Sequence, residues 1–222
     1  MRTVQFIAVC SVFAAQALAQ GDFQNLRFES AVISPIPGNL NGNVYFDQAF
    51  PGWIGICRGV QQTQALYDTF SLSAVDIAII DNGPLSGSLI EGNYTAVLQG
   101  GDSVGGGIAT ISQTGLIPLT AQSLQLRIYS PPLGQFTVSI GGQNIALAPL
   151  QSGANYVLYA GDISSFANQS VELAISALPG NHFLAVDSIA FSSVPVPEPT
   201  ALSFIALGLL SLGWRWRQNS RA

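Results

Sequence analysis

The segment SLQLRIY, residues 123–129, alternates polar and apolar side chains without a break. Because successive side chains of a β-strand point to opposite faces of a sheet, this period of two predicts a half-buried strand. The two leucines and the isoleucine are expected to face a core, with Arg127 and Tyr129 on the outward face. The segment therefore favours a sheet that is packed on one side.

The same alternation recurs in short runs that are bounded by Gly, Pro, Asn and Asp. The expected strands are 23–30, 53–56, 76–80, 94–99, 108–113, 123–129, 136–140, 143–147, 156–159, 171–177 and 183–191. Gly141-Gly142 predicts a hairpin between 136–140 and 143–147, and a single helical turn capped by Asp162 is expected at 162–167. Many strands with almost no helix predict an all-β fold, a single antiparallel β-sandwich or a barrel.

The N-terminus has the pattern of a secretory signal peptide over residues 1–19. Arg2 precedes an apolar stretch, and Ala17-Leu18-Ala19 before Gln20 is an A-x-A cleavage pattern. Export machinery is the implied partner. Removal of this segment leaves Cys57 as the only cysteine, so no intramolecular disulfide is expected. Cys57 lies in an apolar run and is predicted to be a buried, inert thiol.

The C-terminal tail, residues 194–222, combines a Pro-Glu-Pro signature, an apolar run and terminal arginines. A helix over about 200–214 would be roughly 22 Å long against a hydrocarbon core of about 30 Å, which is short for a permanent span. Arg215, Arg217 and Arg221 follow this run. By the positive-inside rule, they place the C-terminus in the cytoplasm and the preceding domain outside.

The signature Val196-Pro197-Glu198-Pro199-Thr200, followed by such a helix, resembles the PEP-CTERM domain of Gram-negative bacteria that build extracellular polysaccharide. The resemblance implies recognition by exosortase, an intramembrane transpeptidase-like enzyme thought to cut the tail. It also implies a membrane-inserted precursor with an extracytoplasmic domain, delivered later to the cell surface or the extracellular matrix.

The charge of the region between these two ends excludes nucleic-acid binding. Residues 20–194 contain three arginines, no lysine and eleven acidic residues, a net charge of −8. Such a domain would be repelled by phosphate backbones. Residues 20–193 are long enough for one domain with its own core, and we expect a single β-sandwich ectodomain.

Three parts of this region together resemble galactose-binding-like jelly rolls, a fold of many carbohydrate-binding modules. These parts are 25–29 with Pro51-Gly52-Trp53, then 161–173, then 186–191. The resemblance implies that an acid from the first strand and one from the last hold a structural calcium ion (Ca²⁺), here Glu29 and Asp187. The alternative is that Glu29 is solvated at a strand edge and that Asp187 accepts backbone N–H groups from a neighbouring loop.

The sequence shows no catalytic constellation. His182 is the only histidine and there is no G-x-S-x-G serine. A non-catalytic exported surface or matrix protein is therefore the favoured hypothesis. The alternatives are a carbohydrate-binding module for matrix exopolysaccharide and a glycan-processing enzyme. Arg127 and Tyr129, which share an outward face, are the candidate ligand pair, although cross-strand packing is the favoured role of Tyr129.

Overall fold

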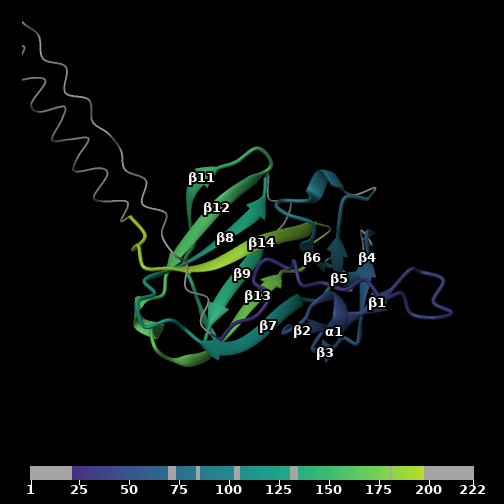
Figure 1. Cartoon of the computed structure of the whole chain (residues 1–222), viewed down its shortest axis with the longest axis horizontal. Coiled ribbons are helices and arrows are strands. Elements are labelled where there is room, and N and C mark those ends of the chain that lie inside the picture. Colours follow the sequence, from purple (N-terminus) through teal and green to yellow (C-terminus); the bar gives the residue numbers. More distant parts are fainter. Residues whose placement is uncertain are drawn as a thin grey trace, which may run out of the picture.

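The computed structural model describes residues 22–69, 74–83, 86–102, 106–130, 135–180 and 182–197. Within these residues the chain folds into two facing β-sheets (Figure 1). One sheet has the strand order β1-β4-β5-β6-β14-β8-β12-β11, and the other has the order β10-β9-β13-β7-β2-β3. The expected all-β sandwich is confirmed.

The strands of the larger sheet are β1 (Val44–Tyr45), β4 (Gln64–Tyr67), β5 (Val75–Ile80), β6 (Thr95–Gly100), β8 (Ser123–Tyr129), β11 (Ala148–Ser152), β12 (Tyr156–Asp162) and β14 (Phe183–Ser192). Those of the smaller sheet are β2 (Ile54–Cys57), β3 (Val60–Gln61), β7 (Ala109–Leu116), β9 (Phe136–Ile140), β10 (Gln143–Asn144) and β13 (Ser170–Ala177). The described helices are the short α1 (Phe46–Ala49) and the 3₁₀ turns η1 (Ser86–Ser88) and η2 (Ser164–Phe166).

The alternating segment 123–129 forms β8 with the bounds that its pattern predicts. Its leucines and isoleucine are fully buried, and β14 beside it is central, paired with β6 and β8. The hairpin of β9 and β10 turns at Gly141 and Gly142, whose φ angles of +56° and +76° suit glycine. Asp162 Oδ1 accepts a hydrogen bond from the Ser164 backbone N–H at 2.9 Å, at the start of η2.

The sheets are not wholly antiparallel, in contrast to the prediction. β4 and β5 run in the same direction, with Leu66 opposite Ala78 and Tyr67 opposite Ile79. The parallel ladder has only these two residue pairs. Before this ladder β4 pairs with β1, whereas β5 pairs with β6 along its whole length. The parallel contact between β4 and β5 is therefore a short exception in a sheet whose other described strand pairs are antiparallel.

The strand expected at Phe23–Ser30 is instead a series of turns. Asn25 and Phe28 have φ angles of +49° and +59°, which a strand does not allow. Phe23, Leu26 and Phe28 are nevertheless buried, and the Trp53 indole N–H donates to the Asn25 carbonyl at 3.2 Å. The apolar residues of this segment thus pack against the core without a β-ladder.

Two apolar clusters result from the alternation along the larger sheet. Ile77 and Ile79 belong to the main core between the sheets, whereas Ala78 and Ile80 belong to a satellite cluster with Val97 and Ala185. Because neighbouring residues of a strand face opposite ways, this satellite cluster lies on the outer face of the larger sheet. Ile90 packs on it, which places the β5–β6 loop (81–94) over that face.

The chain leaves the sandwich at the end of β14, at the left of Figure 1. Ser123 Oγ donates to the Val194 carbonyl at 2.7 Å, and the Val194 N–H donates to Ser192 Oγ at 3.1 Å. Among the described residues no helix is long and apolar enough to cross a membrane. The predicted signal peptide at 1–19 and the predicted helix at about 200–214 lie outside the described residues.

Candidate functional site

A β-bulge in β14 places two polar side chains beneath the β5–β6 loop. Asp187 lies opposite Arg127 of β8, and the register then shifts before Ala190 pairs with Gln125. Ser188 within the bulge has a φ of +49°, and the Ile189 N–H donates to the Leu26 carbonyl at 2.9 Å. The bulge therefore interrupts an otherwise apolar strand at the two residues that contact the loop.

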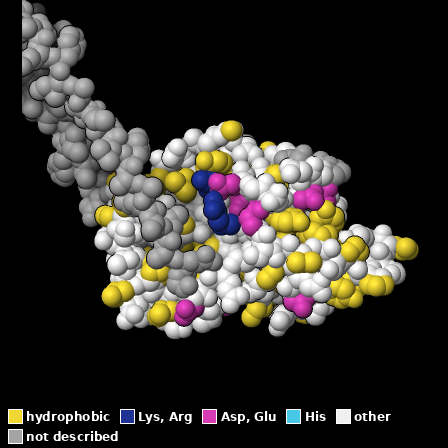
Figure 2. Space-filling model, viewed as in Figure 1, with side chains coloured by type: hydrophobic (Ala, Val, Ile, Leu, Met, Phe, Trp, Pro, Cys, Tyr) yellow, Lys and Arg dark blue, Asp and Glu magenta, His cyan; other side chains and the backbone are white. Residues whose placement is uncertain are grey.

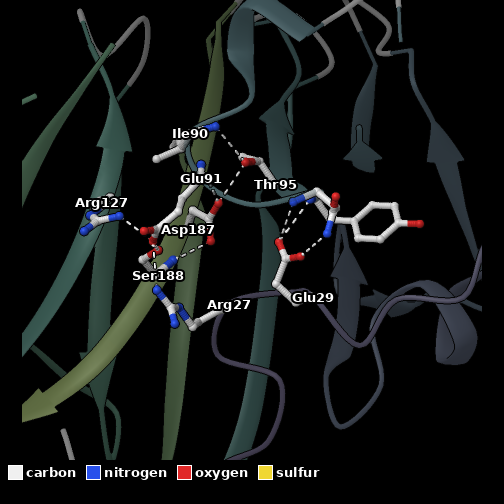
Figure 3. Close-up of polar contacts among 10 residues, drawn as sticks. Arg27, Glu29, Ile90, Glu91, Thr95, Arg127, Asp187 and Ser188 are labelled. Carbon is white, nitrogen blue, oxygen red and sulfur yellow. Dashed lines mark hydrogen bonds and ion pairs between the residues drawn. The ribbon is translucent and has the colours of Figure 1, made fainter. Parts of the chain in front are cut away.

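Asp187 is almost fully buried, with 1% of its surface exposed, and it accepts hydrogen bonds from three donors. Its Oδ2 accepts from Thr95 Oγ1 at 2.9 Å and from the Glu91 backbone N–H at 3.3 Å, and its Oδ1 accepts from the Ser188 N–H (Figure 3). Burial raises the pKa of Asp187 to about 7, since the hydrogen bonds that lower it compensate only in part.

Glu91 joins three segments that are far apart in the sequence. Its Oε2 forms ion pairs with Arg127 and with Arg27, the latter at 3.1 Å, and also accepts from Ser188 Oγ (Figure 3). The hydrogen bond from Arg127 is the main cause that lowers the pKa of Glu91 to about 2. We call Glu91, Asp187, Ser188, Thr95, Arg27 and Arg127 the Glu91 cluster.

Glu29 binds the next part of the same loop. Its Oε1 accepts the backbone N–H groups of Asn93 at 2.8 Å and Tyr94 at 3.2 Å, and its Oε2 accepts Asn93 Nδ2 at 2.8 Å. Gly92 has a φ of +66°, and a Cβ there would lie 2.2 Å from Glu29 Oε1. The loop can therefore wrap this carboxylate only with glycine at 92.

The two predicted calcium ligands, Glu29 and Asp187, border one hollow of about 180 Å³. They hold different partners there, and each carboxylate oxygen accepts at least one protein hydrogen bond. Within the described ranges no group of three His, Cys, Asp or Glu residues could hold a metal ion. Asp187 does accept a loop backbone N–H, that of Glu91, as the alternative interpretation expects.

The predicted ligand pair is engaged by the protein itself. Arg127 pairs with Glu91, and its guanidinium carbon lies 4.8 Å from the centre of the Tyr156 ring. Tyr129 packs against Phe183 of the neighbouring strand, with 6.2 Å between ring centres, and against the satellite cluster. Both side chains thus contribute contacts on the outer face of the sheet.

The remaining reactive side chains are not part of this site. Cys57 is buried, and burial raises the pKa of its thiol to about 12. It is therefore protonated at neutral pH and a poor nucleophile. His182 lies on the surface just before β14.

Sequence reasoning missed Glu91, Thr95 and Ser188. Glu91 lies in a loop without periodic pattern and binds residues 64 and 36 positions away along the chain, so no local signal marks it. The available signal was Asp187, a carboxylate inside an apolar strand that requires polar partners.

Comparison with known proteins gives one sequence match and several structural ones. Residues 195–218 match the PEP-CTERM protein-sorting motif. No curated protein sequence matches the chain significantly. The chain is similar to a cyclase from Fischerella sp. TAU, with a TM-score of 0.51 and 15% identity over 82% of this chain and 100% of that chain.

A further solved structure, TmCBM61 in complex with β-1,4-galactotriose, has a TM-score of 0.47 and 11% identity, over 78% of this chain and 99% of that one. At such identities the likeness to the cyclase describes the fold alone. The chain therefore carries a PEP-CTERM sorting motif, the signal of exosortase substrates that are exported, directly after a two-sheet β-sandwich.

Proposed function

We propose that this chain is a non-catalytic protein of the cell surface or extracellular matrix, which exosortase processes at its C-terminal tail. The match at residues 195–218 carries this proposal. The match begins immediately after Val194, whose backbone C=O and N–H form hydrogen bonds with the side chains of Ser123 and Ser192. A folded domain followed at once by a sorting signal is the arrangement expected of a cargo.

The Glu91 cluster supports a structural role for the domain. Glu91 is neutralised by two arginines, and Asp187 is too deeply buried to reach a substrate. The two carboxylates have pKa values that lie far apart, as in some acid–base pairs. Here, however, the pKa shifts come from a protein ion pair and from burial. The contacts that cause them hold the β5–β6 loop on the sheet.

A carbohydrate-binding module is the second candidate, and the surface composition favours it. Figure 2 shows few charged side chains on this face. Basic and acidic ones lie side by side near its middle, and the surface around them is uncharged. Uncharged polar side chains suit hydroxyl-rich ligands. The glycan-processing alternative requires two carboxylates facing a cleft, and the three that border one hollow, Glu29, Glu91 and Asp187, are all bound to protein donors.

The tail is proposed to act in the membrane only before processing. Its arginines, at positions 215, 217 and 221, would keep the C-terminus in the cytoplasm while the sandwich is outside. The short apolar run between them and the Pro-Glu-Pro signature would then hold the precursor until the cut.

Intact-mass spectrometry of the secreted protein from exosortase-competent cells tests the proposal. We expect a mature form that has lost Arg215 to Ala222, and Glu198→Ala should accumulate the uncut precursor. Glu172→Ala, on the surface of β13, is the matched control and should be processed normally. A secreted protein that retains its arginine-rich end would refute processing.

A further inference from the structure

A second hollow lies where β4 and β5 separate, away from the Glu91 cluster. The parallel ladder begins at Leu66 and Ala78, and the residues before it, Gln64 and Asp76, line a groove of about 290 Å³. The chain crossing from β3 in the smaller sheet to β4 in the larger sheet closes its other side. These strands lie at the right of Figure 1, opposite the end of β14 from which the tail leaves.

Uncharged amides dominate the polar lining of this groove. The polar side chains on it are Asn43, Gln61, Gln62, Thr63, Gln64 and Asp76. Gln64 Oε1 accepts hydrogen bonds from Asn43 Nδ2 at 3.1 Å and Asn39 Nδ2 at 3.3 Å, which fixes the orientation of the Asn43 amide. Asn43 Oδ1 is buried and has no hydrogen-bond partner. That atom has no exposed surface, so a ligand in the groove would meet the exposed Gln61 and Gln64 and the half-buried Asp76 instead.

The charge of the groove selects against anions. Its described lining contains one carboxylate, Asp76, and no basic side chain. Burial raises the pKa of Asp76 and nearby Arg58, which is not on the lining, opposes this only in part, so the carboxylate gains from a donor that replaces lost water. Cys57, also on the lining, stays a neutral thiol because its pKa is raised to about 12. The ligand that fits this lining is uncharged and carries several hydroxyl groups.

We propose that this groove binds one unit of an uncharged saccharide through Gln61, Gln64 and Asp76. Each amide both donates and accepts, as each sugar hydroxyl does, and the carboxylate accepts from two hydroxyls. The volume is near the lower limit of about 300 Å³ for small-molecule sites, so it takes a single ring, not an extended peptide strand. This inference rests on the proposed function, because it names the class of ligand that a cell-surface or matrix protein would bind here.

The affinity of a single groove is expected to be low. No aromatic ring is among the described residues that line it, so the stacking that strengthens many sugar sites is missing. Binding to a polysaccharide with many repeats would then depend on many proteins and many units acting together. Methods that detect weak binding are therefore required.

Affinity electrophoresis of the mature secreted protein in gels containing neutral polysaccharides (galactan, dextran and mannan), with alginate as the anionic control, tests the proposal. We expect retardation by at least one neutral polymer and none by alginate. Asp76→Asn should weaken binding about tenfold and Gln61→Ala a few-fold, because each removes hydrogen bonds to hydroxyls. Thermal melting of each variant checks that the sandwich is intact.

Gln143→Ala is the matched control. Gln143 and Gln61 are both exposed glutamines on two-residue edge strands of the same sheet, at its opposite edges. Equal loss of binding in Gln143→Ala, retardation by alginate only, or no retardation by any neutral polymer would overturn the proposal. If the protein is processed normally but binds none of these polymers, the saccharide groove fails while the proposed function stands.

Discussion

Asp187 lies directly opposite Arg127 across the β8–β14 pair, and one loop residue, Glu91, holds both of them. The Glu91 carboxylate pairs with Arg127, and its backbone N–H donates to Asp187. This three-residue contact connects the middle of the larger sheet to the β5–β6 loop. The loop in turn covers the satellite apolar cluster, so polar and apolar contacts stabilise the same face.

Replacing Glu91 should loosen this loop. Glu91→Gln removes the charge that both arginines and Ser188 bind, and we expect the free energy of unfolding to fall by about 1–3 kcal/mol. Arg27→Ala is the control: that side chain is 66% exposed, and its loss should cost less than about 1 kcal/mol. Urea denaturation of both variants measures the difference, and equal effects would contradict a central role for Glu91.

The stability of the domain should depend on pH through Asp187. Its pKa is raised from 3.8 to about 7 on folding, so the folded state binds a proton more tightly than the unfolded state does. The contribution is complete below about pH 4 and is lost as the pH rises to about 7, a change on the order of 3 kcal/mol. Glu91 acts in the opposite direction, since its lowered pKa removes stability as the pH falls below about 4.5.

Melting temperatures measured from pH 4 to pH 8 test this dependence. Wild type should lose stability over the interval, whereas Asp187→Asn, which carries no titrating proton, should show a flatter profile. A decline of the same slope in both proteins would assign the effect to other groups.

Position 55 of β2, a buried glycine, should not accept a larger residue. A Cβ at Gly55 would lie 2.3 Å from the ring of Phe46, which is itself buried. Gly55→Ala is therefore expected to destabilise the domain by about 1–3 kcal/mol through overpacking. Gly87→Ala in η1, where a Cβ meets nothing within 4 Å, should change stability little. Chemical denaturation of the pair provides the comparison.

Calcium should have little effect on the folded domain. The oxygens of Glu29 and Asp187 already accept hydrogen bonds from Asn93, Tyr94, Thr95, Glu91 and Ser188. A calcium ion would have to displace these donors. We expect the same melting temperature in EDTA and in calcium chloride, and a clear rise with calcium would instead support Glu29 and Asp187 as metal ligands.

The strands that the sequence predicts well are those with strict alternation. Both ends of β8 agree with the predicted strand 123–129. One face of this strand is fully buried, so its apolar residues alternate with polar ones in the sequence. The short strands β1, β3 and β4 were not predicted, since two to four residues leave no period to read.

The segment 23–30 was mispredicted for a related reason. Its apolar residues are buried as in a strand, but they belong to turns at Asn25 and Phe28, and burial alone does not distinguish the two. Likewise, the sequence identified Asp187 as a residue in need of a partner but not which partner. Glu91 is brought there by the fold of the whole sheet, which no short segment encodes.

The hydrogen bond between Ser123 and Val194 determines how the precursor is presented. The sandwich is fixed up to Val194, and Pro195 and Pro197 then restrict the next residues to extended conformations. From Val194 to Pro197 the chain can reach only about 10 Å. If exosortase processes the tail as proposed, it would therefore meet the sorting motif on a short, stiff spacer, close to a complete β-sandwich.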